Sequence, residues 1–205
     1  MSVLNRLAYF QQRRDEVPNQ DLARDLVARQ DRSGVAEIAQ NLWHKNPNVQ
    51  SDCVKVLYEI GYLDPTLIAD YAADFLQLLK SKHNRLVWGG MIALSTIAAL
   101  KADEIYPHIA EILAALESGS VITCDNGIKV IADIAAQSAA YNRKLFPYLL
   151  QHLATCRPKD MPQHAEKISV AVKAKNRAAF AQTLTARLPD LNATQTARVK
   201  KLLRS

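Results

Sequence analysis

A repeat of 37 residues runs through the sequence and constrains its fold more than any other feature. Adding 37 to the numbers of one apolar set gives another apolar set, three times in succession. The sets are Val35, Ile38, Ala39 and Leu42; Ala72, Phe75, Leu76 and Leu79; Ile109, Ile112, Leu113 and Leu116; and Phe146, Leu149, Leu150 and Leu153. The spacing within each set is that of one face of an α-helix, so the sequence predicts the same amphipathic helix four times.

A second apolar pattern runs in step with the first. Its members are Val54, Leu57, Ile60 and Gly61; Met91, Leu94, Ile97 and Ala98; Ile128, Ile131, Ile134 and Ala135; and Ala165, Ile168, Ala171 and Val172. Each repeat therefore carries two amphipathic helices. A single helix pair cannot bury both of its apolar faces, so the pairs must stack on one another in an all-α array.

Proline, glycine and polar residues between the apolar sets indicate where the helices begin and end. We expect a leading helix at about 3–14 and another at about 19–30. Helix pairs follow at about 34–44 with 48–62, 66–81 with 84–99, 103–117 with 121–137, and 142–155 with 161–174, and a shorter pair spans about 176–188 and 193–203. The last pair departs from the 37-residue period, as expected of a terminal repeat with one face in water.

The segment from Asn46 to Gly61 resembles the second helix of a HEAT repeat, in which an N-P-x-V start leads into an apolar helix that ends in I-G. The resemblance covers residues 34–174 and identifies the chain as similar to the HEAT-repeat, armadillo-like α-solenoid family. It implies a right-handed α-α superhelix of about five helix pairs, whose second helices line a concave surface. We expect one domain over 1–205, with capping helices over 1–33, four regular repeats over 34–174 and a basic capping repeat over 175–205.

Positive charge is concentrated at the C-terminal end of the chain. The formal net charge is +6, but residues 1–32 carry +1, residues 33–156 carry −3 and residues 157–205 carry +8. Such a basic segment can attract phosphates or an acidic partner. It can equally be a solvated end of the array, and the sequence leaves both interpretations open.

The sequence lacks the usual signatures of an enzyme. The three cysteines form no C-x-x-C motif, the five histidines are scattered, and no phosphate-binding or nucleophile motif occurs. The longest apolar stretch, Leu86 to Leu100, is shorter than the ~20 residues that cross a bilayer. We therefore expect a non-enzymatic cytoplasmic protein with no catalytic residues, no metal, no cofactor and no membrane association.

The candidate binding residues lie on the second helices, opposite the apolar stripe. They are Asp52, Lys55, Arg85, Trp88, Asp125 and Lys129. Trp88 is the most informative, because large aromatic side chains are common anchors of interfaces, although packing between repeats would also explain it. The charged members have partners three or four residues away, as in Asp52 with Lys55 and Lys129 with Asp133, which is typical of exposed helices.

Glycines beside Trp88 have two expected roles. Gly90 aligns with Cys53 and Gly127 in a column of small residues, which favours close approach of neighbouring helices. Gly89 lies outside this column, and we expect it to leave room for a ligand beside the indole ring.

Two classes of function follow. The first is a scaffold that binds a protein or peptide on its concave surface through residues such as Trp88. The second is a nucleic-acid function, in one of two forms. In the first form, the basic end binds phosphates. In the second form, which rests on resemblance to HEAT-like alkylpurine DNA glycosylases, Trp88, Arg85 and Asp125 form a cleft for a cationic base. The basic residues concerned are Lys173, Lys175, Arg177, Arg187, Arg198, Lys200, Lys201 and Arg204.

Overall fold

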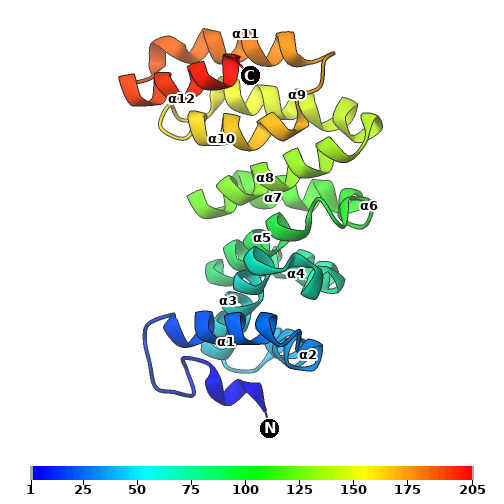
Figure 1. Ribbon diagram of the computed structural model, residues 1–205, viewed down its shortest axis with the longest axis vertical. Helices are drawn as coiled ribbons and strands as arrows, with labels where there is room; N and C mark the ends of the chain where they lie inside the picture. The colour runs from blue at the N-terminus through cyan, green and yellow to red at the C-terminus, as the bar shows by residue number, and fades with distance from the viewer. Residues whose placement is uncertain (1, 205) are drawn as a thin grey trace. The chain divides into compact units, whose positions relative to one another are not determined.

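The computed structural model describes residues 2–204, and within that range every regular element is an α- or 3-10 helix (Figure 1). The all-α prediction is therefore confirmed. The chain divides into two compact units, Met1–Gly127 and Ile128–Ser205. Within residues 2–204 no helix is both long enough and apolar enough to span a bilayer.

The first unit contains helices that follow one another in pairs along the chain. Its elements are η1 (Val3–Arg6), α1 (Val17–Ala28), α2 (Arg32–Gln40), η2 (Asn41–Trp43), α3 (Pro47–Leu63), η3 (Pro65–Leu67), η4 (Ala69–Tyr71), α4 (Ala72–Leu78), α5 (Asn84–Ile97), α6 (Ala102–Ile105), η5 (Tyr106–His108), α7 (Ile109–Ser118) and the first part of α8 (Val121–Gln137). Helices α1, α3 and α5 pack side by side, while α2 packs on α3 and α4 on α5. The second helices of successive repeats thus form one continuous layer in this unit.

The second unit repeats the pairing of helices. After the end of α8 it contains α9 (Ala139–Thr155), α10 (Met161–Ile168), η6 (Ser169–Ala171), α11 (Arg177–Arg187), η7 (Leu188–Asp190) and α12 (Ala193–Arg204). Helix α9 packs on α10 and α11, and α10 packs on α12. The expected pairs at about 142–155 with 161–174 and 176–188 with 193–203 are therefore present.

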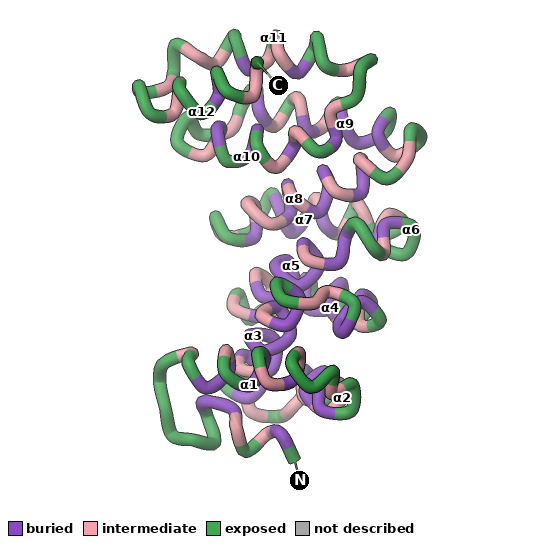
Figure 2. The backbone as a smooth tube through the Cα atoms, viewed as in Figure 1, coloured by how far each residue is buried: buried purple, intermediate pink, exposed green. Residues whose placement is uncertain are grey.

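The apolar sets of the repeat form the core, as the sequence predicts (Figure 2). Every member of the second set is buried except Val172, which is half-buried. In the first set only Ile109, Leu113 and Leu150 are half-buried, and the rest are buried. Burial of each large apolar side chain contributes about 1.5–3 kcal/mol, so the repeated stripes supply most of the stabilisation.

Side-chain caps explain where two of the helices begin. The Asn46 side chain accepts a hydrogen bond from the amide of Asn48 at 2.9 Å, and Pro47 takes the first position of α3, where its missing N–H leaves no bond unmade. Asp31 caps α2 in the same way, accepting from the amide of Gly34 at 2.9 Å. These hydrogen bonds satisfy amides that have no partner within their own helix.

Glycines in α5 allow close contact with both neighbouring helices. A Cβ added to Gly90 would lie 2.9 Å from Cβ of Leu78 and 3.0 Å from the backbone oxygen of Phe75, which explains its place in the column of small residues. The expectation that Gly89 leaves room for a ligand is wrong. A Cβ there would lie 2.9 Å from both methyl groups of Val54, so Gly89 lets α5 pack closely on α3.

The prediction of a leading helix at about 3–14 is also wrong. Only Val3–Arg6 form a helical turn, and Gln12 reverses the chain with a positive φ of 56°. The amide of Ala8 donates to the Asn19 side chain at 3.0 Å, and that of Tyr9 donates to Asp52 at 2.8 Å. Since these amides bond to distant side chains, they cannot form the carbonyl bonds of an α-helix.

Several first helices are shorter than expected. The segment expected as one helix at about 66–81 consists of η3, η4 and α4, and that at about 103–117 consists of α6, η5 and α7. Pro65 and Pro107 lie in the 3-10 turns of these segments. Proline cannot donate a backbone hydrogen bond, which favours a break in the helix near each of them.

Candidate functional site

Lys55 lies at the centre of a charged cluster on α3, close to the start of α1. Its Nζ is 2.8 Å from Glu16 and 2.6 Å from Glu59, and its side chain is only 7% exposed. The expectation that Lys55 faces solvent is therefore wrong. Burial alone would lower the pKa of Lys55, but the hydrogen bonds to Glu16 and Glu59 outweigh it and raise the pKa above its ordinary value.

Arg85 approaches the same glutamate from α5. Its Nη2 lies 2.7 Å from the second carboxylate oxygen of Glu16, so this glutamate joins cations on two different helices. The Nε of Arg85 is buried and has no hydrogen-bond partner within residues 2–204. One donor of the guanidinium group is thus unused in this structure, and burial shields it from solvent.

Aromatic rings, one of them the buried ring of Tyr58, lie beside these cations. The guanidinium carbon of Arg85 lies 5.8 Å from the centre of the Trp88 ring, and Nζ of Lys55 lies 4.8 Å from that of Tyr58. The ring of Tyr58 lies between those of Trp88 and Tyr62, with distances between ring centres of 6.1 and 6.0 Å. The side chain of Tyr62 is exposed. We call Lys55, Tyr58, Tyr62, Arg85 and Trp88 the aromatic-cation surface.

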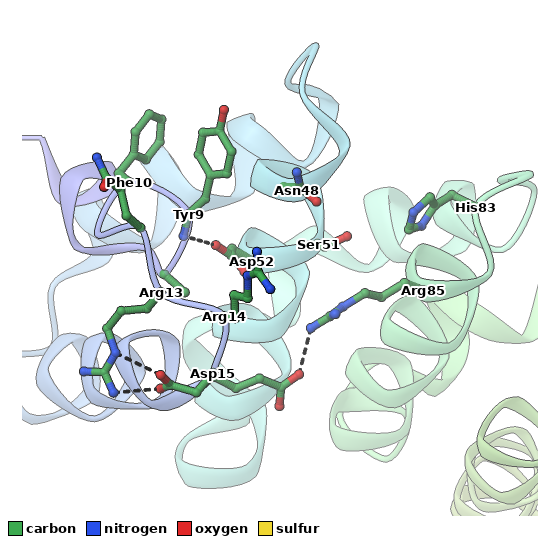
Figure 3. A pocket seen from close by; sticks show the side chains of 13 residues that line it. Tyr9, Phe10, Arg13, Arg14, Asp15, Asn48, Ser51, Asp52, His83 and Arg85 are labelled. Atoms are coloured by element: carbon green, nitrogen blue, oxygen red, sulfur yellow. Dashed lines mark hydrogen bonds and ion pairs between the residues drawn. The ribbon is translucent and has the colours of Figure 1, made fainter.

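An N-terminal loop, residues 8–16, borders this surface and forms a pocket of about 930 Å³ (Figure 3). Asp52 holds the loop by accepting hydrogen bonds from the Tyr9 amide and from the Asn19 side chain, both at 2.8 Å. The predicted pairing of Asp52 with Lys55 is thus replaced by contacts with the loop. Arg13 forms two hydrogen bonds of 2.9 Å with Asp15, which lowers the pKa of that carboxyl group.

The other two predicted residues lie on α8 and have a local environment of their own. Asp125 is half-buried, and Lys129 forms the predicted ion pair with Asp133 at 2.5 Å. Burial raises the pKa of Asp133 above its ordinary value, although Lys129 acts in the opposite direction. The structure therefore brings together Lys55, Arg85 and Trp88, while Lys129 belongs to the second unit.

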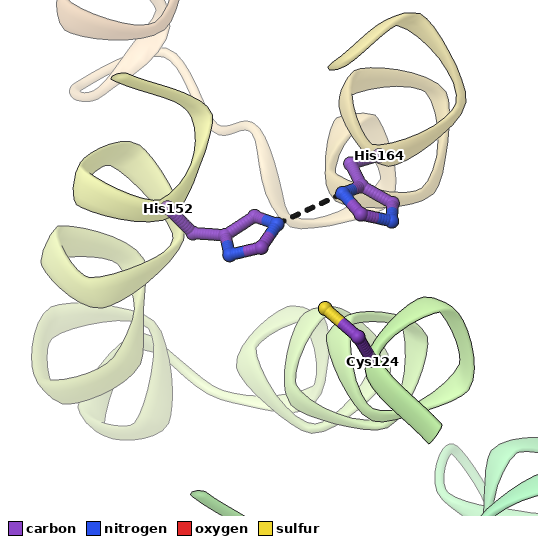
Figure 4. Close-up of side chains that lie close together, drawn as sticks. All are labelled: Cys124, His152 and His164. Atoms are coloured by element: carbon purple, nitrogen blue, oxygen red, sulfur yellow. Dashed lines mark hydrogen bonds between the residues drawn. The ribbon is translucent and has the colours of Figure 1, made fainter. Parts of the chain in front are cut away.

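A histidine pair in the second unit was not predicted. His152 Nε2 and His164 Nδ1 are 2.8 Å apart and share a hydrogen bond between α9 and α10 (Figure 4). Imidazole nitrogens are also common metal ligands. Twelve residues separate the two histidines, so no local spacing motif signals their contact. Cys124, drawn in the same figure, belongs to the first unit.

Two of the predicted basic residues at the C-terminal end have structural partners. Arg187 donates to the backbone oxygens of Leu153 and Cys156, at 2.6 and 2.9 Å, and so caps the end of α9. Arg198 forms a double hydrogen bond with Glu166, at 2.9 and 2.6 Å, which lowers the pKa of that carboxyl group. The remaining predicted residues are exposed: Lys173, Lys175, Arg177, Lys200, Lys201 and Arg204.

Comparison with known proteins finds similarity in structure only. No family model matches the sequence, and no curated protein matches it. An engineered protein superposes with a TM-score of 0.70 at 16% identity, covering 100% of this chain and 96% of the other. A designed armadillo repeat protein, solved in complex with the peptide (KR)4, superposes with a TM-score of 0.69 at 13% identity, covering 90% of this chain and 85% of the other.

A natural helical-repeat protein is also similar. Kap121p gives a TM-score of 0.64 at 18% identity, with 91% of this chain matched to 20% of that much longer chain. At these identities the likeness carries information on the fold alone. The fold of this chain is accordingly that of an armadillo- and HEAT-like helical-repeat protein, as the resemblance of residues 46–61 to a HEAT repeat implies.

Proposed function

We propose that this chain is a non-enzymatic repeat scaffold that binds a protein or peptide partner through the exposed face of its second helices. The aromatic-cation surface carries the proposal. It combines a half-buried tryptophan, an exposed tyrosine and two cations on adjacent helices. Tryptophan, tyrosine and arginine are the residues most often found as energetic anchors of protein interfaces.

The mixed chemistry of this surface favours a peptide over a nucleic acid. Nucleic-acid sites present an excess of cations to the phosphates, whereas here Lys55 and Arg85 alternate with Glu16 and Glu59. The same ion pairs disfavour a glycosylase, because both carboxylates that approach Lys55 are already engaged with a cation. The designed relative's peptide complex agrees with this choice at the level of the fold.

Selection from a random peptide library tests the proposal. Wild-type protein is immobilised, and the enriched peptides are then measured against Trp88→Ala and Trp43→Ala. Trp43 is the matched control, because it is half exposed and lies on the first-helix side, where its Nε1 donates to Asp74 at 3.1 Å. We expect Trp88→Ala to weaken binding by about tenfold or more, as for an anchor residue, and Trp43→Ala to have no effect.

The opposite results would overturn the proposal. Equal binding of a peptide to wild type and Trp88→Ala would contradict the assignment of the site. Failure to enrich any peptide would contradict the proposed function. Circular dichroism of Trp88→Ala shows whether a loss of binding follows from a loss of fold. Arg85→Ala provides a second variant of the same surface if the tryptophan variant is unfolded.

A nucleic-acid function through the basic end is a second candidate. Its support is the group of exposed cations on residues 173–204 of the second unit, which have few acidic neighbours in the sequence. Binding of a duplex should weaken steeply with salt and should be reduced by Lys200→Gln with Lys201→Gln. Absence of binding at low salt would exclude this candidate.

A further inference from the structure

Glu16 contacts the aromatic-cation surface in the way that a ligand carboxylate would. Its two oxygens are divided between Lys55 on α3 and Arg85 on α5, at 2.8 and 2.7 Å. Glu16 stands at the position preceding α1, yet its side chain makes no capping hydrogen bond to that helix. The first amide of α1, that of Val17, donates to Asp15 at 3.1 Å instead, and the Glu16 carboxylate contacts the two cations rather than its own helix.

The charges of the site favour an anion in this place. The contacts join Lys55 and Arg85 with two carboxylates, those of Glu16 and Glu59. If Glu16 turns away, two cations face one carboxylate, and one of the cations is on a side chain that is only 7% exposed. Lys55 then keeps Glu59, but Arg85 loses its only carboxylate among residues 2–204, so a carboxylate from a partner would restore the pairing of both cations.

Arg85 could bind such a carboxylate better than it binds Glu16. Glu16 uses only Nη2 of the guanidinium group, and the buried Nε has no partner. A carboxylate that accepts from Nε and Nη2 together has the strongest arrangement for this pair, and this needs the buried Nε to be uncovered when Glu16 leaves. Glu16 contacts Nη2 while its other oxygen is bound to Lys55.

We propose that Lys55 and Arg85 recognise an acidic side chain of the partner, and that Glu16 occupies this site when no partner is bound. The inference rests on the proposed function and names the chemistry of the peptide. The peptide carries Glu or Asp next to a large apolar side chain, because the exposed ring of Tyr62 and the half-buried ring of Trp88 lie beside the two cations. This partner differs in charge from (KR)4, the peptide bound by the designed relative.

Displacement of Glu16 needs no unfolding of its neighbours. Its side chain is 42% exposed, and rotation about its side-chain bonds takes the carboxylate into water. The N-terminal loop stays attached through Ala8 and Tyr9, whose amides bond to Asn19 and Asp52. The Glu16 carboxylate therefore competes with the partner as a local intramolecular ligand.

Two peptide libraries test the inference. One carries a fixed central Phe-Glu and the other a fixed central Phe-Gln, and both have random flanking residues. On Glu16→Ala protein we expect the Glu library to be enriched about tenfold over the Gln library, because the cations are free to bind a carboxylate. On wild type the preference should be smaller, since Glu16 competes. Adding Arg85→Gln to Glu16→Ala should abolish it.

Matched controls separate this mechanism from a general charge effect. Asp15→Ala removes the neighbouring carboxylate, which pairs with Arg13, and should leave the wild-type preference unchanged. Arg85→Lys in the Glu16→Ala background keeps the charge and loses the side-on pair of donors, so the preference should be intermediate.

The outcomes distinguish the inference from the proposed function. Equal enrichment of both libraries on Glu16→Ala would overturn the carboxylate site while leaving a peptide-binding surface. The carboxylate site would also be overturned if Asp15→Ala raised the preference for the Glu library as much as Glu16→Ala does. Retention of neither library by any variant would overturn both.

Discussion

Replacement of Asn142 tests how the second unit is held together. This side chain is 1% exposed at the start of α9. Its Nδ2 donates to the backbone oxygens of Ala135 and Ala171, at 3.2 and 2.7 Å, and its Oδ1 accepts from Asn176 at 2.9 Å. One amide thus joins the end of α8, the end of η6 and the segment before α11.

The cost of Asn142→Ala follows from these contacts. Each hydrogen bond contributes about 0.5–1.5 kcal/mol, and the three contacts together predict a loss of about 2–4 kcal/mol. The carbonyl of Ala171 retains only a longer contact with Asn176, at 3.5 Å. Asn142→Asp should cost more than Ala at neutral pH, because it turns a charged oxygen toward two carbonyl oxygens.

Urea unfolding followed by circular dichroism measures both variants. In thermal unfolding, at about 2–4 °C per kcal/mol for a chain of this size, the melting temperature of Asn142→Ala should fall by roughly 4–16 °C. Asn142→Asp should regain part of its stability at acid pH, where a protonated carboxyl can donate one hydrogen bond. If Asn142→Asp is as stable as wild type at pH 7, the donated hydrogen bonds do not hold the unit together and the reasoning fails.

Three further predictions concern other parts of the chain. Arg198 lowers the pKa of Glu166 below its ordinary value of 4.5. The ion pair therefore stabilises the fold above about pH 4.5, and this stabilisation is lost as the pH falls through the lowered pKa. The urea midpoints of wild type and Glu166→Gln should accordingly converge at acid pH. A gap that persists unchanged there would contradict this. Gly90→Ala should destabilise by about 1–3 kcal/mol despite the better helix propensity of alanine, because the added methyl meets Leu78, and a more stable variant would refute the close contact. Burial raises the pKa of the fully buried Cys53 thiol, so a thiol reagent should modify it only after unfolding; rapid labelling of the native protein, read by mass spectrometry, would contradict its burial.

The sequence predicts the helices well where the repeat is strict. The apolar stripes fix α3, α5 and α8 to within a residue or two of their bounds, because burial of one face decides both their position and their rotation. The prediction is wrong over 3–14, where apolar residues have helical spacing but the amides of Ala8 and Tyr9 bond to Asn19 and Asp52. Such side-chain bonds to a distant backbone leave no periodic signal.

The candidate site is only partly predictable for the same reason. Periodicity places Arg85 and Trp88 on one face of α5, and the structure keeps them adjacent. It also assigns Lys55 to the exposed face, but the start of α1 brings Glu16 over that position from 39 residues earlier. A contact between a loop and a helix in another repeat depends on the path of the chain, which the local pattern does not encode.

Fluorescence of Trp88 tests most directly whether the partner covers this face of α3 and α5. The chain has two tryptophans, so Trp43→Phe leaves Trp88 as the single reporter, half-exposed beside Arg85. Titration with a selected peptide should shift the Trp88 emission in a saturable way, with the same dissociation constant as an independent binding assay. Full binding with no change in that emission would contradict the account.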